Sequence, residues 1–143
     1  MNDIDTPRYS TIEVCRLAGL TYRQADYLAD WVGHVTNGPG RPRRWTPRQV
    51  VQAYVISTLM GRGVEKPAAS TVAQLVRADV EYIVVPAEAG EAFAATDLLD
   101  LLDGIAGPAT VVVKLPPELR DLITSPQKET FRRRDGDHPS LRE

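Results

Sequence analysis

The stretch GRPRRWTPRQVV, residues 40–51, decides the fold expected of the N-terminal half of this chain. Three arginines and a tryptophan fill four of the five positions from Arg41 to Trp45, and the glycine and prolines around them favour a turn or hairpin. Thr46 can then cap a helix with its side-chain oxygen, and Pro47 suits the first helical position because its φ is already helical. The stretch therefore predicts a basic loop followed at once by a helix, with Trp45 buried and anchoring the loop on that helix.

Two shorter helices are expected before this loop. Each would begin with a small polar cap that is followed three residues later by Glu or Gln, which is the spacing of a capping box: Ser10 with Glu13, and Thr21 with Gln24. Gly19 separates them. Apolar residues recur at helical spacing, and the core candidates are Ile12, Leu17, Leu20, Ala25, Leu28, Ala29 and Val32. Two short helices joined across a tight glycine-containing turn outline a helix-turn-helix.

The remainder of the chain predicts a change of architecture near residue 80. Two helices are expected after the basic loop, from residue 46 to 61 or 63 and from residue 67 or 70 to 78. Beyond them, runs of β-type residues at 82–85 and 110–115 alternate with helical patterns at 88–103 and 118–123. If the two strands are parallel, their long connection suits a right-handed crossover. Two strands alone are not stable, so this part must pack on the N-terminal half or on a second copy of itself.

The charge of the chain is divided between its halves. Residues 8–66 carry nine basic and four acidic side chains, whereas residues 81–123 carry two basic and eight acidic ones, although the whole chain has a net charge of only −2. A polyanion would attract the first part and repel the second. The single cysteine, Cys15, excludes an internal disulfide and is expected to be a plain packed thiol. No apolar run suits a membrane helix, so we expect a cytoplasmic protein that does not contact the membrane.

The order helix, turn, helix, basic loop, capped helix resembles the winged helix-turn-helix of the MerR family of DNA-binding regulators. The resemblance is carried by STIEVCRLAGLTYRQADYLADWVGHV (residues 10–35) and RRWTPRQVVQAYVISTLMGRGV (residues 43–64). The matching features are Thr21 as the cap of the second helix, Asp26-Tyr27 as its aromatic and charged cluster, Arg43 to Thr46 as the end of the wing, and Gly63 after the third helix. TYRQADY is most similar to the actinobacterial branch, in which an Asp-Tyr pair replaces the usual Arg-Tyr.

The resemblance implies that the second helix enters the major groove of DNA while the wing lies along the backbone. Arginines on the wing would neutralise phosphates, and one can enter a narrow minor groove. Arg23 is suited to guanine and Gln24 to adenine, whereas Thr21 and Tyr22 are expected on phosphates. The predicted DNA-binding residues are Thr21, Tyr22, Arg23, Gln24, Tyr27, Arg41, Arg43, Arg44 and Arg48.

The fold class expected is therefore α+β, in three parts. Residues 1–79 would form the winged helix-turn-helix, residues 80–124 a small acidic β-α-β-α unit, and residues 125–143 a polar, disordered tail. Typical family members dimerise through one long helix, which this chain interrupts with Pro86, Gly90, Gly104, Gly107, Pro108, Pro116 and Pro117. We therefore expect a homodimer held by residues 80–124, or a protein partner docked there.

Two alternatives to a transcriptional regulator stay open. One is a phage or mobile-element excisionase or repressor with the same winged fold, and the other is a protein-interaction adaptor that has lost DNA binding. Asp26 and the acidic half favour the adaptor. We expect no enzyme, metal or cofactor, because no catalytic grouping or nucleotide-binding motif is present and His34 and His138 are far apart. The sequence leaves the operator, the sign of regulation and any small-molecule effector open.

Overall fold

The computed structural model of the 143-residue chain describes residues 3–32, 36–38, 41–86, 92–97, 99–101 and 109–124, which form an α+β fold. The predicted tail at 125–143 lies outside these residues. The helical elements are a 3-10 turn at Asp3–Asp5, α1 at Thr11–Ala18, α2 at Tyr22–Leu28, α3 at Pro47–Gly61, α4 at Lys66–Ala73 and α6 at Pro117–Thr124. The strands are β1 at Thr36–Gly38, β2 at Arg41–Arg44, β3 at Tyr82–Pro86, β4 at Phe93–Ala95 and β5 at Ala109–Lys114.

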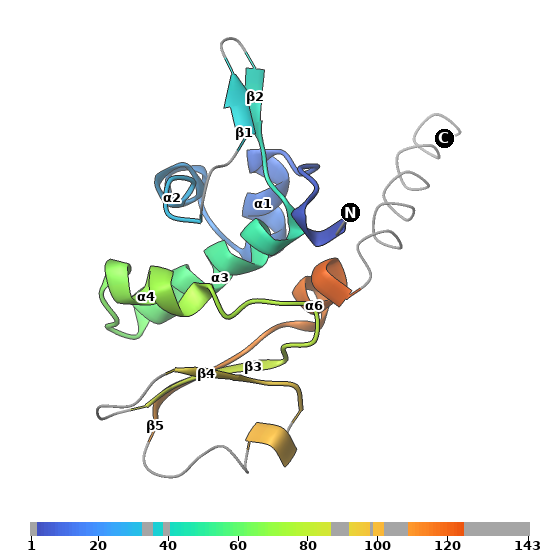
Figure 1. Cartoon of the computed structure of the whole chain (residues 1–143). Helices are drawn as coiled ribbons and strands as arrows, with labels where there is room; N and C mark the ends of the chain where they lie inside the picture. Colours follow the sequence, from blue (N-terminus) through green and yellow to red (C-terminus); the bar gives the residue numbers. More distant parts are fainter. Residues whose placement is uncertain are drawn as a thin grey trace.

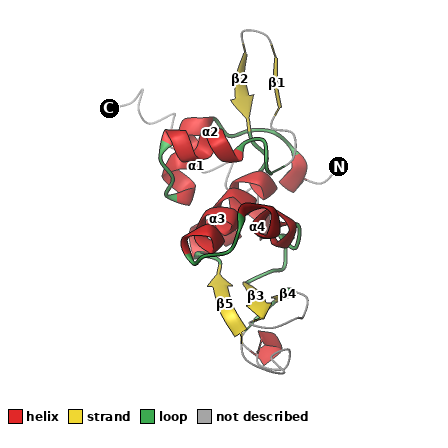
Figure 2. Cartoon of the chain, turned by 90° about the vertical axis from the view of Figure 1, so that its left-hand side faces the viewer, coloured by secondary structure: helices red, strands yellow, loops and turns green. Residues whose placement is uncertain are grey.

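The elements are arranged along one long direction of the molecule. The antiparallel β1–β2 hairpin projects at one end beside α1 and α2, as Figure 1 shows, and the sheet that contains β3, β4 and β5 lies at the opposite end. Helices α3, α4 and α6 lie between them. The view in Figure 2 shows the same order from the side. The hairpin predicted before Trp45 is therefore confirmed.

The first three α-helices begin with the reciprocal caps that the sequence predicts or allows. In each, the cap hydroxyl accepts a hydrogen bond from the backbone N–H three residues on, and the Glu or Gln there accepts one from the cap N–H: Ser10 with Glu13, Thr21 with Gln24, and Thr46 with Gln49. Each box satisfies donors that a helix start leaves without intrahelical partners. After α1, Gly19 adopts a φ of 70°, a left-handed conformation that ends the helix at little steric cost.

The cap of α3 offers a stability test, because Thr46 is buried whereas the equivalent cap of α2, Thr21, is exposed. We expect Thr46→Ala to lower the free energy of unfolding by about 1–2 kcal/mol, and Thr21→Ala by about 0.5–1 kcal/mol. Water can replace the lost acceptor only at the exposed site. Urea unfolding measures both values, and Thr46→Ser is the matched control that keeps the hydroxyl. If both substitutions lowered the free energy of unfolding equally, burial of the cap would not explain its contribution to stability.

Trp45 fastens the base of the hairpin to the start of the chain. Its backbone N–H donates to the Tyr9 carbonyl at 2.8 Å, and its carbonyl accepts from the Tyr9 N–H at 3.0 Å. Its indole Nε1 donates to Thr11 Oγ1 at 3.1 Å. Both aromatic residues are fully buried. The predicted burial of Trp45 is confirmed, and the hydrogen bonds attach the hairpin to α1 and to the segment before it.

The inward face of α1 differs from the one expected. Ile12 is largely exposed, whereas Thr11, Val14 and Ala18 are buried. These three positions lie at i, i+3 and i+7 on one helix face, and Ile12 is turned about 100° away from Thr11. The core assignment of Ile12 is therefore wrong, while the predicted core residues of the α2 region, Ala25, Leu28, Ala29 and Val32, are all buried.

The C-terminal part is not the β-α-β-α unit that the sequence suggested. It contains a three-stranded antiparallel sheet in the order β4-β3-β5, so the two predicted strands, β3 and β5, are antiparallel. Part of the predicted helix at 88–103 is strand β4, and only residues 99–101 of it are helical within the described residues. Leucines gave that stretch a helical pattern, but Phe93 to Ala95 pair with Val84 to Tyr82. A short return to the neighbouring strand is possible only for antiparallel pairing.

One hydrophobic cluster runs from the hairpin base to the sheet. It includes Trp45, residues of α3 such as Ile56, and residues beyond the predicted boundary at 79/80, among them Ile83, Val113 and Leu122. Helix α6 packs against α3, so the chain returns from the sheet into the helical core. A smaller cluster of Val84, Ala95 and Leu101 covers the other face of the sheet. The C-terminal part therefore packs on the N-terminal half, which is one of the two arrangements expected for it.

Candidate nucleic-acid interface

The exposed face of α2 displays most of the residues predicted to bind DNA. Ala25 and Leu28 turn inward and are buried. Tyr22, Arg23 and Tyr27 are exposed, and so are Gln24 and the cap residue Thr21. The amphipathic pattern of the helix therefore places polar and aromatic side chains on one solvent-facing surface.

The cap of α2 constrains two of these residues. The backbone N–H of Gln24 donates to Thr21 Oγ1 at 3.1 Å, and the backbone N–H of Thr21 donates to Gln24 Oε1 at 2.9 Å. The side-chain oxygen of Gln24 is thus used within the helix start, whereas its amide NH₂ is not part of the box. In this conformation the NH₂ group can donate to adenine N7, whereas the oxygen that would accept from adenine N6 already accepts from the Thr21 N–H.

The hairpin is linked to α2 by an ion pair. Arg43 Nη1 donates to Asp26 Oδ1 at 2.7 Å and to the Asp26 backbone carbonyl at 3.2 Å. The Arg43 side chain is 26% exposed and that of Asp26 is 59% exposed, so the pair lies at the surface and contributes little to overall stability. Its consequence is geometric, because it holds the end of the hairpin beside the exposed face of α2. This anchoring role of Asp26 was not predicted.

Of the two other arginines on the hairpin, Arg44 is the one whose side chain the structure describes. Arg44 is exposed at the end of β2, and none of the ion pairs between described residues involves it. Arg41 begins β2, and its side chain lies outside the described part of the chain. Among the described residues no carboxylate neutralises Arg44, so it adds a positive charge to the hairpin next to the partly neutralised Arg43.

Lys66 joins this surface although the sequence did not single it out. Its ammonium group lies 3.8 Å from the centroid of the Tyr27 ring and 4.2 Å from that of Trp31, and it also contacts the Tyr27 hydroxyl. Such cation–π contacts hold a lysine in place near aromatic faces. The lysine is the first residue of α4 and approaches α2 only through the tertiary fold. It adds a positive charge beside the exposed Tyr27.

Arg48 has a different place from the other predicted residues. Its Nε donates to Asp5 Oδ1 at 2.8 Å, and its Nη1 donates to the backbone carbonyl of Val76 at 2.6 Å. The guanidinium thus ties the 3-10 turn at the start of the chain to the segment after α4. These bonds give Arg48 an intramolecular role, and we leave it out of the interface proposed below.

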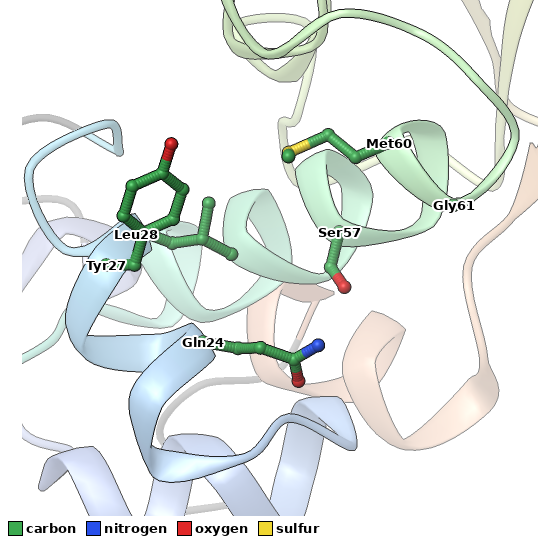
Figure 3. Close-up of a pocket in the computed structure, with 6 residues that line it drawn as sticks. All are labelled: Gln24, Tyr27, Leu28, Ser57, Met60 and Gly61. Atoms are coloured by element: carbon green, nitrogen blue, oxygen red, sulfur yellow. The ribbon is translucent and has the colours of Figure 1, made fainter.

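A pocket of about 260 Å³ opens beside the exposed face of α2. It is lined by Gln24, Tyr27 and Leu28 from α2 and by Ser57, Met60 and Gly61 from the last turn of α3. Figure 3 shows these side chains around the space between the two helices. Its lining combines apolar groups with one amide and two hydroxyls. The pocket shares Gln24 and Tyr27 with the surface predicted to meet DNA.

Three other features of the described residues bear on chemistry away from this surface. Burial raises the pKa of the half-buried Cys15 thiol, which disfavours the thiolate and hence nucleophilic chemistry there. Within the described residues, no group of three or more His, Cys, Asp or Glu side chains is arranged to hold a metal ion. None of the described helices has the length and apolar character needed to cross a membrane.

Together, these residues form one candidate interface at the hairpin end of the molecule. The surface, called here the basic surface, consists of Thr21, Tyr22, Arg23, Gln24, Asp26, Tyr27, Arg43, Arg44 and Lys66. In comparisons with known proteins, no protein-family model matches the chain, and no curated protein matches it at a significant level.

Proposed function

We propose that this protein is a sequence-specific, double-stranded DNA-binding transcriptional regulator with a winged helix-turn-helix of MerR-like type. The observation that carries the proposal is the Asp26–Arg43 link, which joins the exposed face of α2 to the projecting basic hairpin. A helix and a hairpin fixed side by side suit the two parts of a duplex that a winged helix contacts, namely the major groove and the neighbouring backbone.

Each part of the basic surface has a distinct role in this proposal. The start of α2 enters the major groove, where Arg23 donates two hydrogen bonds to guanine and Gln24 contacts adenine. Thr21 and Tyr22 meet phosphates at the rim of the groove. The hairpin acts as the wing, and its arginines contact phosphates or enter the minor groove. Lys66, held by Tyr27 and Trp31, contributes a further phosphate contact.

The distribution of charge supports this docking direction. The acidic residues Glu81, Asp97, Asp100, Glu118 and Asp121 belong to the sheet end and α6, while the hairpin projects from the opposite end. DNA bound at the basic surface is therefore kept away from the acidic end, where it would be repelled.

Selection of bound duplexes from a random DNA pool tests the proposal. At about 150 mM salt, where non-specific binding is suppressed, we expect an enriched motif. Inverted half-sites would indicate a two-fold arrangement on one duplex, whereas direct repeats would indicate the head-to-tail arrangement of an excisionase-like factor. If no motif is enriched, the regulator proposal is wrong.

Asp26 provides a second test through its effect on Arg43. We expect Asp26→Asn to raise affinity for non-specific DNA several-fold, because it removes a negative charge from the surface and frees the guanidinium for phosphate. The slope of a plot of the logarithm of the association constant for DNA against the logarithm of the salt concentration should steepen by about one unit. Fluorescence anisotropy with a labelled duplex at several salt concentrations measures both quantities.

A double-mutant cycle identifies the cause of that effect. Arg43→Ala should weaken binding more in the Asp26→Asn background than in the wild-type chain, because only the released arginine contacts phosphate fully. Additive effects of the two substitutions would mean that Asp26 acts by repulsion alone and not through Arg43.

One observation favours a protein-interaction adaptor as the second candidate. Asp26 partly neutralises Arg43, and the neighbouring pocket, which exposed Tyr27 and Met60 help to line, is a suitable anchor site for a protein side chain. An adaptor would show no salt-dependent DNA affinity, so the binding measurements above also distinguish this function from the first.

A further inference from the structure

Strand β5 lies at an edge of the C-terminal sheet. In the order β4-β3-β5, its one strand neighbour within the described residues is β3. β5 has six residues, whereas β4, at the opposite edge, has three. Proteins usually protect a sheet edge with a short strand, a charge, a proline or a bulge, because unpaired backbone groups there attract another strand. The short β4 is protected in this way, but the valines at 111–113 leave the middle of β5 without a charge or a proline.

The register shows which backbone groups of β5 face outward. Ile83 pairs with Val113, and the Leu115 N–H donates to the Glu81 carbonyl at 2.9 Å. In an antiparallel ladder, every second residue points both its N–H and its C=O at the neighbouring strand. Val111 and Val113 therefore bond to β3, and Val112 and Lys114 present their N–H and C=O groups at the outer edge, where no described strand pairs with them.

The side chains follow the same alternation. Val111 and Val113 are each 3% exposed because they face the main core, whereas Val112, between them, is 38% exposed. Val112 lies opposite the buried Val84 of β3 and next to the small cluster that covers that face of the sheet. The middle of β5 thus exposes an apolar side chain together with backbone groups suited to one more strand.

We propose that β5 pairs antiparallel with β5 of a second copy of this chain, about a two-fold axis at Val112. In this register Val112 lies opposite Val112 of the other copy, and Lys114 lies opposite Thr110. The strand is its own complement, so a single contact joins two three-stranded sheets into one of six strands in the order β4-β3-β5-β5-β3-β4. A contact made by one edge strand is small, so the dimer forms reversibly as the protein concentration rises.

The packing of β5 determines how the two copies are placed. Val111 and Val113 face the main core, so the helices lie on that face of the sheet, above it in Figure 1. A two-fold axis that relates two antiparallel strands is perpendicular to the sheet, so this face lies on the same side in both copies. The helices and hairpins of both copies therefore lie on one side of the joined sheet. If the proposed DNA binding holds, one dimer presents two basic surfaces related by a two-fold axis, which suits two inverted half-sites on one duplex.

Sedimentation velocity and hydrogen exchange test the pairing on the full chain without DNA. The sedimentation coefficient should rise from a monomer value to a dimer value over the micromolar range. In the dimer the amides of Val112 and Lys114 should be protected, and on dilution their exchange should accelerate about tenfold or more. The amides of Val111 and Val113 should stay protected at every concentration. A monomer throughout, or concentration-independent exchange at Val112, would overturn the proposal.

A matched pair of variants tests the register. Val112→Lys places like charges opposite each other at the axis, and we expect it to weaken dimerisation about tenfold or more. Val112→Thr keeps the β-branched shape and the backbone groups, so it should still dimerise. Thermal unfolding of both variants checks that the fold is retained. If Val112→Lys folds and dimerises as the wild-type chain does, the two-fold contact lies elsewhere.

Binding to single and paired half-sites then separates the pairing from the proposed function. The wild-type protein and Val112→Thr should bind cooperatively to a duplex that carries two inverted half-sites. Val112→Lys should bind a single half-site with unchanged affinity but lose this cooperativity. Dimerisation without any DNA binding would contradict the proposed function but support the β5 pairing. DNA binding by a chain that stays monomeric would support the proposed function but contradict the β5 pairing.

Discussion

Replacing Trp45 by alanine is expected to lower the free energy of unfolding by about 3–5 kcal/mol, the typical cost of truncating a large buried aromatic residue. The side chain is fully buried, and its indole N–H donates to Thr11. Loss of the ring would leave a cavity where the hairpin base, α1 and α3 meet. Because a single hydrophobic cluster extends from Trp45 to the sheet, the variant should unfold in one transition at a lower temperature.

Two control variants separate packing from hydrogen bonding at this position. Trp45→Phe keeps most of the apolar volume but loses the indole donor, and it should cost clearly less than Trp45→Ala. Thr11→Val keeps the ring and leaves the buried indole N–H without this acceptor, at a cost of about 1–3 kcal/mol. Chemical unfolding followed by circular dichroism measures all three. A loss below about 1 kcal/mol for Trp45→Ala would mean that the hairpin base is not part of the cooperative core.

The second large effect concerns DNA. We expect Arg23→Ala to weaken binding to the selected operator by about 1–3 kcal/mol and to relax the sequence preference at one base pair. Arg44→Ala should weaken binding to every sequence alike and reduce the salt slope by about one unit, since it removes a phosphate contact. Because the two residues lie on different elements, α2 and β2, the double variant should show nearly additive losses.

Arg77 is the matched control for both substitutions. It is an exposed arginine after α4, paired with Asp79, and it is not part of the basic surface. Arg77→Ala changes the net charge by the same amount, so an effect of overall charge alone would appear there too. Binding of all variants to the operator and to a scrambled duplex should be measured by anisotropy. If Arg23→Ala weakened both duplexes equally, Arg23 would contact the backbone and not a base.

Local spacing was enough to predict those parts of the fold that depend on residues three or four positions apart. The capping boxes of α1 and α2, the start of α3 at Thr46-Pro47, and the glycine turn after α1 all appear where the sequence predicts them. In each box the interacting residues are three positions apart, as with Ser10 and Glu13. Such contacts form within one turn of helix, so their partners can be identified from spacing alone.

The contacts between residues that are far apart in the chain could not be predicted, because they form only when the chain folds. Arg43 meets Asp26 across 17 residues, and Arg48 meets Val76 across 28 and Asp5 across 43. One arginine is thereby fixed on the candidate interface and the other is used inside the molecule, although both stand in the same basic stretch. No local pattern distinguishes them, because a guanidinium pairs with whichever carboxylate or carbonyl the fold brings near.

The C-terminal sheet shows the same division. The β-type runs at 82–85 and 110–115 could be recognised from their composition, but their antiparallel pairing and the strand at Phe93–Ala95 could not. Leucine spacing favoured a helix across residues 88–103, while pairing with β3 made residues 93–95 a strand. Strand propensity depends on neighbours across the sheet, so the partner and not the segment decides its conformation. For the same reason, the sequence could not show that β5 is an edge strand, because this depends on the order of the strands in the sheet.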